Sequence, residues 1–110
     1  MMKPQLSVAA SGLLRALLAR TGVDRDRILI CEWTSVDWQS LTFIGERHEA
    51  MFRITGPDAP RLVAMIADGL DEAEFTIPGQ IVADIALGQP PLPQPDGSIL
   101  VTIEALTVGV

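Results

Sequence analysis

The sequence predicts an α+β fold, a two-layer sandwich of about five mostly antiparallel strands with two helices on one face. Apolar residues recur with helical spacing in two segments, and elsewhere they alternate with polar residues as in strands. The predicted order is helix, three strands, helix, two strands, which is typical of an α+β fold. The chain has 110 residues, of which 48% are hydrophobic, so we expect one domain spanning residues 1–110.

The first predicted helix runs from about Ser7 to Arg20. Its apolar face contains residues at three- and four-residue spacing, namely Leu6, Ala10, Leu13, Leu14, Leu17 and Leu18. Gly22 stands where a left-handed residue would end the helix. Gly12 lies mid-helix, where glycine costs about 1 kcal/mol, so we expect another backbone segment to approach it closely.

Three strands are predicted between the helices. The first begins at Ile28 and ends near Thr34. The next two form a hairpin with its turn at residues 45–47, because apolar and polar residues alternate on both sides. The residues predicted on its inward face are Leu41, Phe43, His48, Ala50, Phe52 and Ile54.

The second predicted helix begins within residues 56–60, because proline is tolerated in a first helical turn. Its buried side contains Leu62, Val63, Ile66 and Leu70. The strand that follows has one face made of Ile81, Ala83, Ile85 and Leu87. A loop with four prolines, at residues 88–98, leads to a last strand that we expect to pair with the Ile81 strand.

Two helices on one side would leave the other side of the sheet uncovered. The residues predicted on that side are Thr42, Ile44, Glu49, Met51, Arg53, Val82, Leu100, Thr102, Glu104 and Leu106. Large apolar side chains mixed with charges are more typical of an interface than of a solvated surface. We therefore expect a homodimer, or another protein partner, to contact Ile44, Met51, Arg53, Leu100 and Leu106.

Trp33 and Trp38 bracket a short segment between the first two predicted strands. Indoles at the end of an element can contact a ligand or partner, and a dimer contact is the functional interpretation here. The alternative is that both rings cap the core beneath the first helix. Cys31 follows apolar residues, and we expect it to be buried because free cysteine is among the most buried residue types.

His48 is the only histidine, and Glu46 is close to it in the sequence. With Asp37, these residues are the candidates for acid–base catalysis or for a ligand pocket between the sheet rim and the helices. We favour the alternative, a rim histidine hydrogen-bonded to backbone or a carboxylate, because spacing fixes no second catalytic group. The sequence contains no metal-ligand spacing and no cofactor motif, so neither group is expected.

The charge distribution narrows the class of partner. Eight basic residues stand against fourteen acidic ones, and a net charge of −6 disfavours nucleic-acid binding. A small cationic patch is predicted only where Arg15, Arg20, Arg25 and Arg27 occur close together. All basic residues precede Leu62, so a basic macromolecule is a further candidate partner.

The apolar stretch within residues 3–19 is interrupted by Arg15, and no apolar run of about 20 residues occurs. A single cysteine also excludes a disulfide framework. We therefore expect a cytoplasmic protein without a membrane partner.

Together these patterns favour a non-enzymatic, self-associating domain that acts as a binding or assembly module. The second hypothesis is a small enzyme or ligand-binding protein with a pocket near His48 and Glu46.

Overall fold

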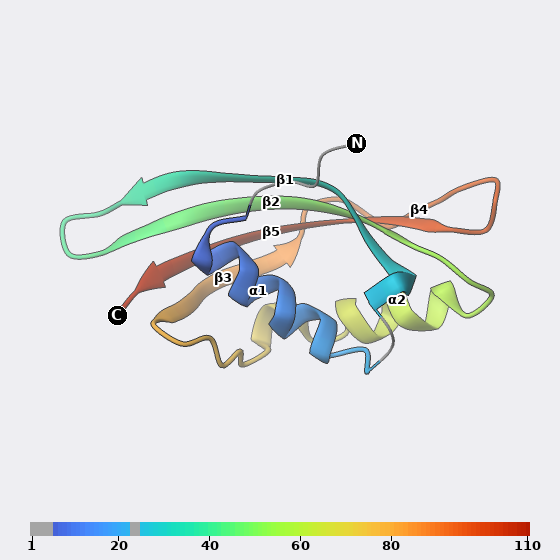
Figure 1. Cartoon of the computed structure of the whole chain (residues 1–110), viewed down its shortest axis with the longest axis horizontal. Helices are drawn as coiled ribbons and strands as arrows, with labels where there is room; N and C mark the ends of the chain where they lie inside the picture. Colours follow the sequence, from blue (N-terminus) through green and yellow to red (C-terminus); the bar gives the residue numbers. More distant parts are fainter. Residues whose placement is uncertain (1–5, 23–24) are drawn as a thin grey trace.

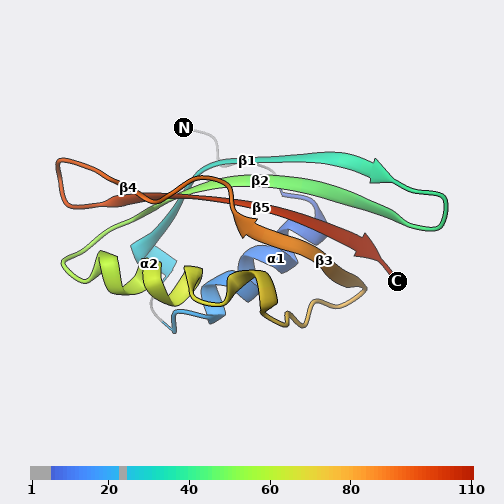
Figure 2. The same ribbon diagram turned by 180° about the vertical axis from the view of Figure 1, so that it is seen from behind.

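A computed structural model describes residues 6–22 and 25–110 and confirms the predicted α+β class. Helices α1 (Val8–Ala19) and α2 (Ala59–Ala67) lie on one side of an antiparallel sheet (Figures 1 and 2). No helix of the described residues covers the other side, which we call the open face. The start of the apolar N-terminal stretch, up to residue 5, lies outside the described residues.

The sheet contains β1 (Ile28–Gln39), β2 (Ile44–Ile54), β3 (Gln80–Leu87), β4 (Leu92–Pro93) and β5 (Ile99–Gly109). The strand order is β1-β2-β5-β3, and the short β4 pairs with β5. The predicted pairing of the last strand with the Ile81 strand is confirmed. Two 3-10 turns, η1 (Arg25–Arg27) and η2 (Leu70–Glu72), precede β1 and β3. Two strands rather than three separate the helices, so the predicted element order was wrong there.

The first hairpin turns earlier than predicted. β1 continues to Gln39, and the turn at residues 40–43 is closed by the Ser40 N–H donating to the Phe43 carbonyl at 2.9 Å. The Ser40 hydroxyl also accepts the Phe43 N–H at 3.0 Å, so serine provides the turn chemistry. Leu41 and Phe43 are therefore exposed near the turn, not on the inward face.

Gly45, predicted to form the turn, lies within β2 between Trp38 of β1 and Val108 of β5. A Cβ atom there would stand 2.0 Å from the Thr107 carbonyl oxygen. Glycine at this position allows two strands to approach closely, so it serves packing within the sheet and not a turn.

A bulge in β1 changes which residues face the helices. The register shifts between Ile30 and Glu32, so Cys31 is the additional residue. Cys31 is exposed, and the prediction of a buried thiol was wrong. After the bulge Trp33 lies on the helix side, opposite Ala50.

A second bulge interrupts β3 between Val82 and Asp84. Val82 and Ile85 pack toward the core, whereas Ile81 faces away from it. The predicted common face for Ile81 and Ile85 was wrong because Ala83 breaks the alternation.

Most of the predicted open-face residues lie on the open face by register, namely Glu49, Met51, Arg53, Leu100, Thr102, Glu104 and Leu106. The prediction was wrong for three residues. Thr42 belongs to the turn, Ile44 shares the helix side with Glu46 and His48, and Val82 packs against the core.

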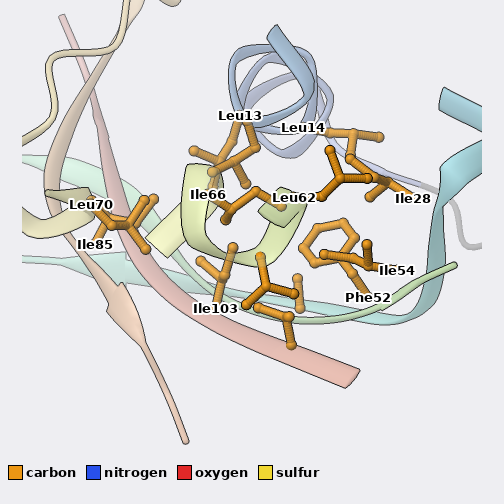
Figure 3. Close-up of a cluster of buried hydrophobic side chains, with 14 of the residues drawn as sticks. Leu13, Leu14, Ile28, Phe52, Ile54, Leu62, Ile66, Leu70, Ile85 and Ile103 are labelled. Atoms are coloured by element: carbon orange, nitrogen blue, oxygen red, sulfur yellow. The ribbon is translucent and has the colours of Figure 1, made fainter. Parts of the chain in front are cut away.

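The core lies between the helices and the sheet (Figure 3). The largest contributions come from both helices and the central strands, including Leu13, Leu14, Leu62, Ile66, Phe52, Ile54 and Ile103. Ser7 caps α1, because its hydroxyl accepts the Ala10 N–H at 3.1 Å. Gly22 adopts the predicted left-handed conformation with φ of 64°. The Ile77 side chain packs against Gly12, because an added Cβ would stand 2.6 Å from Ile77 Cγ2. The predicted approach of another backbone segment was therefore wrong.

Gly12→Ala should destabilise the protein by about 1–3 kcal/mol, because the new methyl group would overlap the buried Ile77 side chain. The same change at an unobstructed helix position would stabilise the helix by about 1 kcal/mol. Urea unfolding measures the difference. In an Ile77→Ala background the substitution should become neutral or stabilising, and a stabilising Gly12→Ala in the unchanged chain would contradict this packing.

Candidate functional site

His48 lies in the middle of β2, on the helix side of the sheet, and is only 1% exposed. The predicted rim position was wrong because the turn lies at residues 40–43 and not beside His48. Nδ1 is 2.8 Å from Ser35 Oγ on β1, and Nε2 is 2.9 Å from Thr107 Oγ1 on β5. His48 therefore joins three adjacent strands through hydroxyl groups rather than through backbone or a carboxylate.

The position of the Trp33 indole indicates which ring nitrogen of His48 carries the hydrogen. Its N–H donates to Ser35 Oγ at 3.0 Å and also lies 3.4 Å from His48 Nδ1. An indole N–H can only donate, so Nδ1 is the accepting nitrogen and Ser35 donates its own hydrogen to it. The hydrogen of the neutral imidazole is thereby on Nε2, where Thr107 accepts it.

The Trp33 ring packs edge-on against His48 and Phe52, with centroid separations of 5.9 Å in both cases. It is half-buried against the core, as the structural alternative predicted. Trp38 does not share this position, because the register places it on the open face beside Gly45.

Glu46 lies on the same side of β2 as His48 and binds the start of α1. The Ser7 hydroxyl donates to Glu46 Oε1 at 2.7 Å while it caps the helix. Asp37 is the cross-strand partner of Glu46 and is exposed. The three acid–base candidates therefore share one side of the sheet, with Glu46 next to His48 along β2 and Asp37 across from Glu46 on β1.

Burial lowers the pKa of His48 from its ordinary value of 6.5, and the negative charge of Glu46 offsets part of this effect. A cavity of about 270 Å³ that includes His48 in its lining is otherwise formed by Thr34, Val36, Arg47, Glu49 and Glu104. The register places these residues on the open face, away from the imidazole ring. The geometry thus fits a polar link between strands better than a base that faces a substrate.

Two of the arginines from the predicted cationic patch are engaged within the fold. Arg20 donates to the Asp68 carbonyl at 2.7 Å and lies over the Phe75 ring. Arg27 binds the Thr55 carbonyl at 2.8 and 2.9 Å and forms an ion pair with Asp58. The Arg27 hydrogen bond is the main reason that the pKa of Asp58 is lowered.

The open face is arranged in rows that cross all four long strands. Three consecutive rows are Trp38–Gly45–Val108–Ile81, Val36–Arg47–Leu106–Asp84 and Thr34–Glu49–Glu104–Ala86. At the far end of the face lie Leu29, Arg53, Leu100 and Leu92. Five predicted interface residues are on this face by register, namely Trp38, Met51, Arg53, Leu100 and Leu106, although Leu106 is already buried within the protomer. The other two, Trp33 and Ile44, are on the helix side.

Sequence reasoning did not identify Ser35 or Thr107. They are 13 and 59 residues from His48, and only the strand register brings them to it. Within residues 6–22 and 25–110, no three histidine, cysteine or acidic side chains gather closely enough to hold a metal ion. Neither helix in that part of the chain has the length and hydrophobicity to cross a membrane.

Comparisons with protein-family models, curated proteins and solved structures found no match to this chain.

Because the pKa of His48 is lowered in the fold, the unfolded chain binds a proton more readily than the folded protein. The free energy of unfolding should therefore decrease as pH falls through 6.5, by at most about 1.4 kcal/mol per pH unit, until the folded-state pKa is passed. Urea unfolding between about pH 7.5 and 5.5 measures this loss of stability. Most carboxylates titrate below this pH range and therefore contribute little to it.

His48→Gln is the matched control, because it keeps a donor and an acceptor but cannot titrate. Its stability should change less over the same pH range. Since the chain has one histidine, a single imidazole NMR signal reports the folded-state pKa. A midpoint at or above 6.5 would show that burial does not dominate.

Proposed function

We propose that this protein is a non-enzymatic assembly module that forms a homodimer by packing the open faces of two copies together. The observation that carries this proposal is the side of the sheet that no helix of the described residues covers, where apolar side chains lie among charges of both signs. Val36, Ile81 and Leu92 are exposed there, and Met51 and Leu100 are half-buried. Such a mixture resembles the surface of a protein–protein interface.

The size of the open face supports a stable dimer. Four strands spaced about 4.8 Å apart, three of them about 11 residues long and β3 8 residues long, cover roughly 650 Å². A typical specific interface uses about 800 Å² of each partner. Two sheets packed face to face would form a sandwich with a second core about 10 Å thick.

The charges favour a second copy over an unrelated partner. Glu49 and Glu104 are direct cross-strand neighbours and both are exposed, an unfavourable pair within one sheet. Arg47 is exposed in the next row, whereas Arg53 lies 3.9 Å from Asp96 of its own chain. One face therefore carries both the acidic pair and the cation that would compensate it, as an isologous contact requires.

These rows also select the direction of pairing. A two-fold axis across the strands, level with His48, would place Arg47 of each copy over Glu49 of the other. The same axis sets Met51 of one copy above Gly45 of the second, where no side chain stands. An axis along the strands would instead bring the acidic rows of both copies together, which like-charge repulsion disfavours.

An enzyme or ligand-binding protein that uses His48 and Glu46 is the second candidate. The convergence of Asp37, Glu46 and His48 on one side of the sheet supports it. Against it, the imidazole is 1% exposed and hydroxyl groups contact both ring nitrogens. We therefore rank the assembly module first.

Arg47→Glu and Glu49→Arg should each weaken the dimer by about tenfold or more, because each places like charges against one another across the interface. The double variant Arg47→Glu/Glu49→Arg should recover most of the affinity, since it restores opposite charges in the reverse sense. Analytical ultracentrifugation of all four proteins gives the dissociation constants.

Arg15→Glu, an exposed site on α1, is the matched control and should leave dimerisation unchanged. An unchanged protein that is monomeric at about 100 µM, a concentration well above a micromolar dissociation constant, would refute the homodimer. A dimer that is insensitive to the charge exchange would refute this direction of pairing only.

A further inference from the structure

Exposed apolar side chains gather at one end of the molecule, where the β1–β2 turn projects beyond both helices (Figures 1 and 2). We call residues 38–45 the hairpin tip. Within it Leu41 is 105% exposed, Ile44 73% and Phe43 50%. Val110 is also exposed, and its N–H donates to the Gly79 carbonyl next to the start of β3.

The apolar side chains of the hairpin tip point in several directions. The register places Trp38 on the open face and Ile44 on the helix side, and Leu41 lies in the turn between the strands. A flat partner, including the second copy proposed above, covers only one face of a hairpin. A surrounding apolar medium accommodates both faces and the turn at once.

Polar groups of the turn are hydrogen-bonded within the turn itself. The Ser40 N–H donates to the Phe43 carbonyl, and the Ser40 hydroxyl accepts the Phe43 N–H. These internal bonds reduce the cost of removing the turn from water, because an unpaired polar group is expensive in an apolar environment.

The hairpin tip is uncharged, and its depth matches the lipid interface. The nearest charges along both strands are Asp37 and its cross-strand partner Glu46. At about 3.3 Å per strand residue, the steps from Asp37 to Leu41 place this pair roughly 13 Å from the end of the turn. Apolar segments bound at a membrane surface enter it by about 5–10 Å.

We propose that the hairpin tip inserts into the interfacial region of a zwitterionic lipid bilayer. Leu41, Phe43 and Ile44 contact the acyl boundary, and Trp38 lies at headgroup level, where indoles are favoured. The net charge of −6 disfavours anionic lipid. This proposal replaces the sequence-based expectation that no membrane is a partner. It does not depend on dimerisation, since the proposed dimer covers the tip only on its open-face side, at Trp38 and Gly45, and leaves Leu41 and Ile44 free at opposite ends of the dimer.

Flotation with phosphatidylcholine vesicles tests the insertion. The unchanged protein should float with the vesicles, and Leu41→Ser and Phe43→Ser should each reduce the partition coefficient by about tenfold. Leu92→Ser removes an equally apolar, 59% exposed side chain from the other end of the sheet and should have no effect. Exposed substitutions of this kind leave the core untouched, so folding is retained.

Tryptophan quenching by brominated phosphatidylcholine provides the second measurement. Quenching should occur in the unchanged chain and disappear in Trp38→Phe, because the remaining Trp33 lies against the core. The Arg47→Glu variant separates this proposal from the dimer, since it should retain quenching while it loses self-association.

Four results would overturn the insertion: no flotation at millimolar phosphatidylcholine, binding only when anionic lipid is added, binding that survives both serine substitutions, or quenching that persists in Trp38→Phe. If the serine substitutions abolish self-association instead of lipid binding, the tip is a protein contact and the proposal fails.

Discussion

Burial of one side of the sheet beneath α1 and α2 is the constraint on which the other features depend. In the part of the chain that the structure describes, α1 and α2 are the two α-helices, and both pack over side chains such as Phe52 and Ile103. The helices therefore cannot also cover the reverse side of β2 and β5, where Met51 and Leu100 lie. The open face is a consequence of this economy, and its composition determines which partner would cover it.

The side chains of β2 on the helix side change from apolar to charged along the strand. Ile54, Phe52 and Ala50 belong to the core, His48 follows, and Glu46 is next to it. A neutral imidazole suits this boundary because hydroxyl groups satisfy both of its nitrogens at low solvent exposure. Glu46 then holds the beginning of α1 through Ser7, so the helix begins where the apolar core ends.

The fold class and both helices could be predicted from the sequence, because helical spacing, Ser7 and the proline-rich start of α2 are local signals. The turn could not be placed, since Gly45 is equally compatible with a turn and with close strand approach, and only the Thr107 carbonyl decides between them. The bulges at Cys31 and Ala83 have no sequence signature, yet each reverses the faces of the residues beyond it. The contacts of His48 were likewise hidden, because they require the register of three strands.

The open face and the hairpin tip differ in shape and charge, and this difference argues for two kinds of partner. The open face is broad and carries Arg47 beside Glu49, so transfer into lipid would leave both charges poorly solvated. A protein surface with the same charges in reverse order can compensate them, and a second copy has that order. The hairpin tip is narrow and uncharged and carries apolar side chains on both faces, so it fits an interfacial lipid environment better than a charged protein surface. Leu41 illustrates the point, because neither the core nor the proposed dimer interface reaches it and its apolar character serves no contact within the fold.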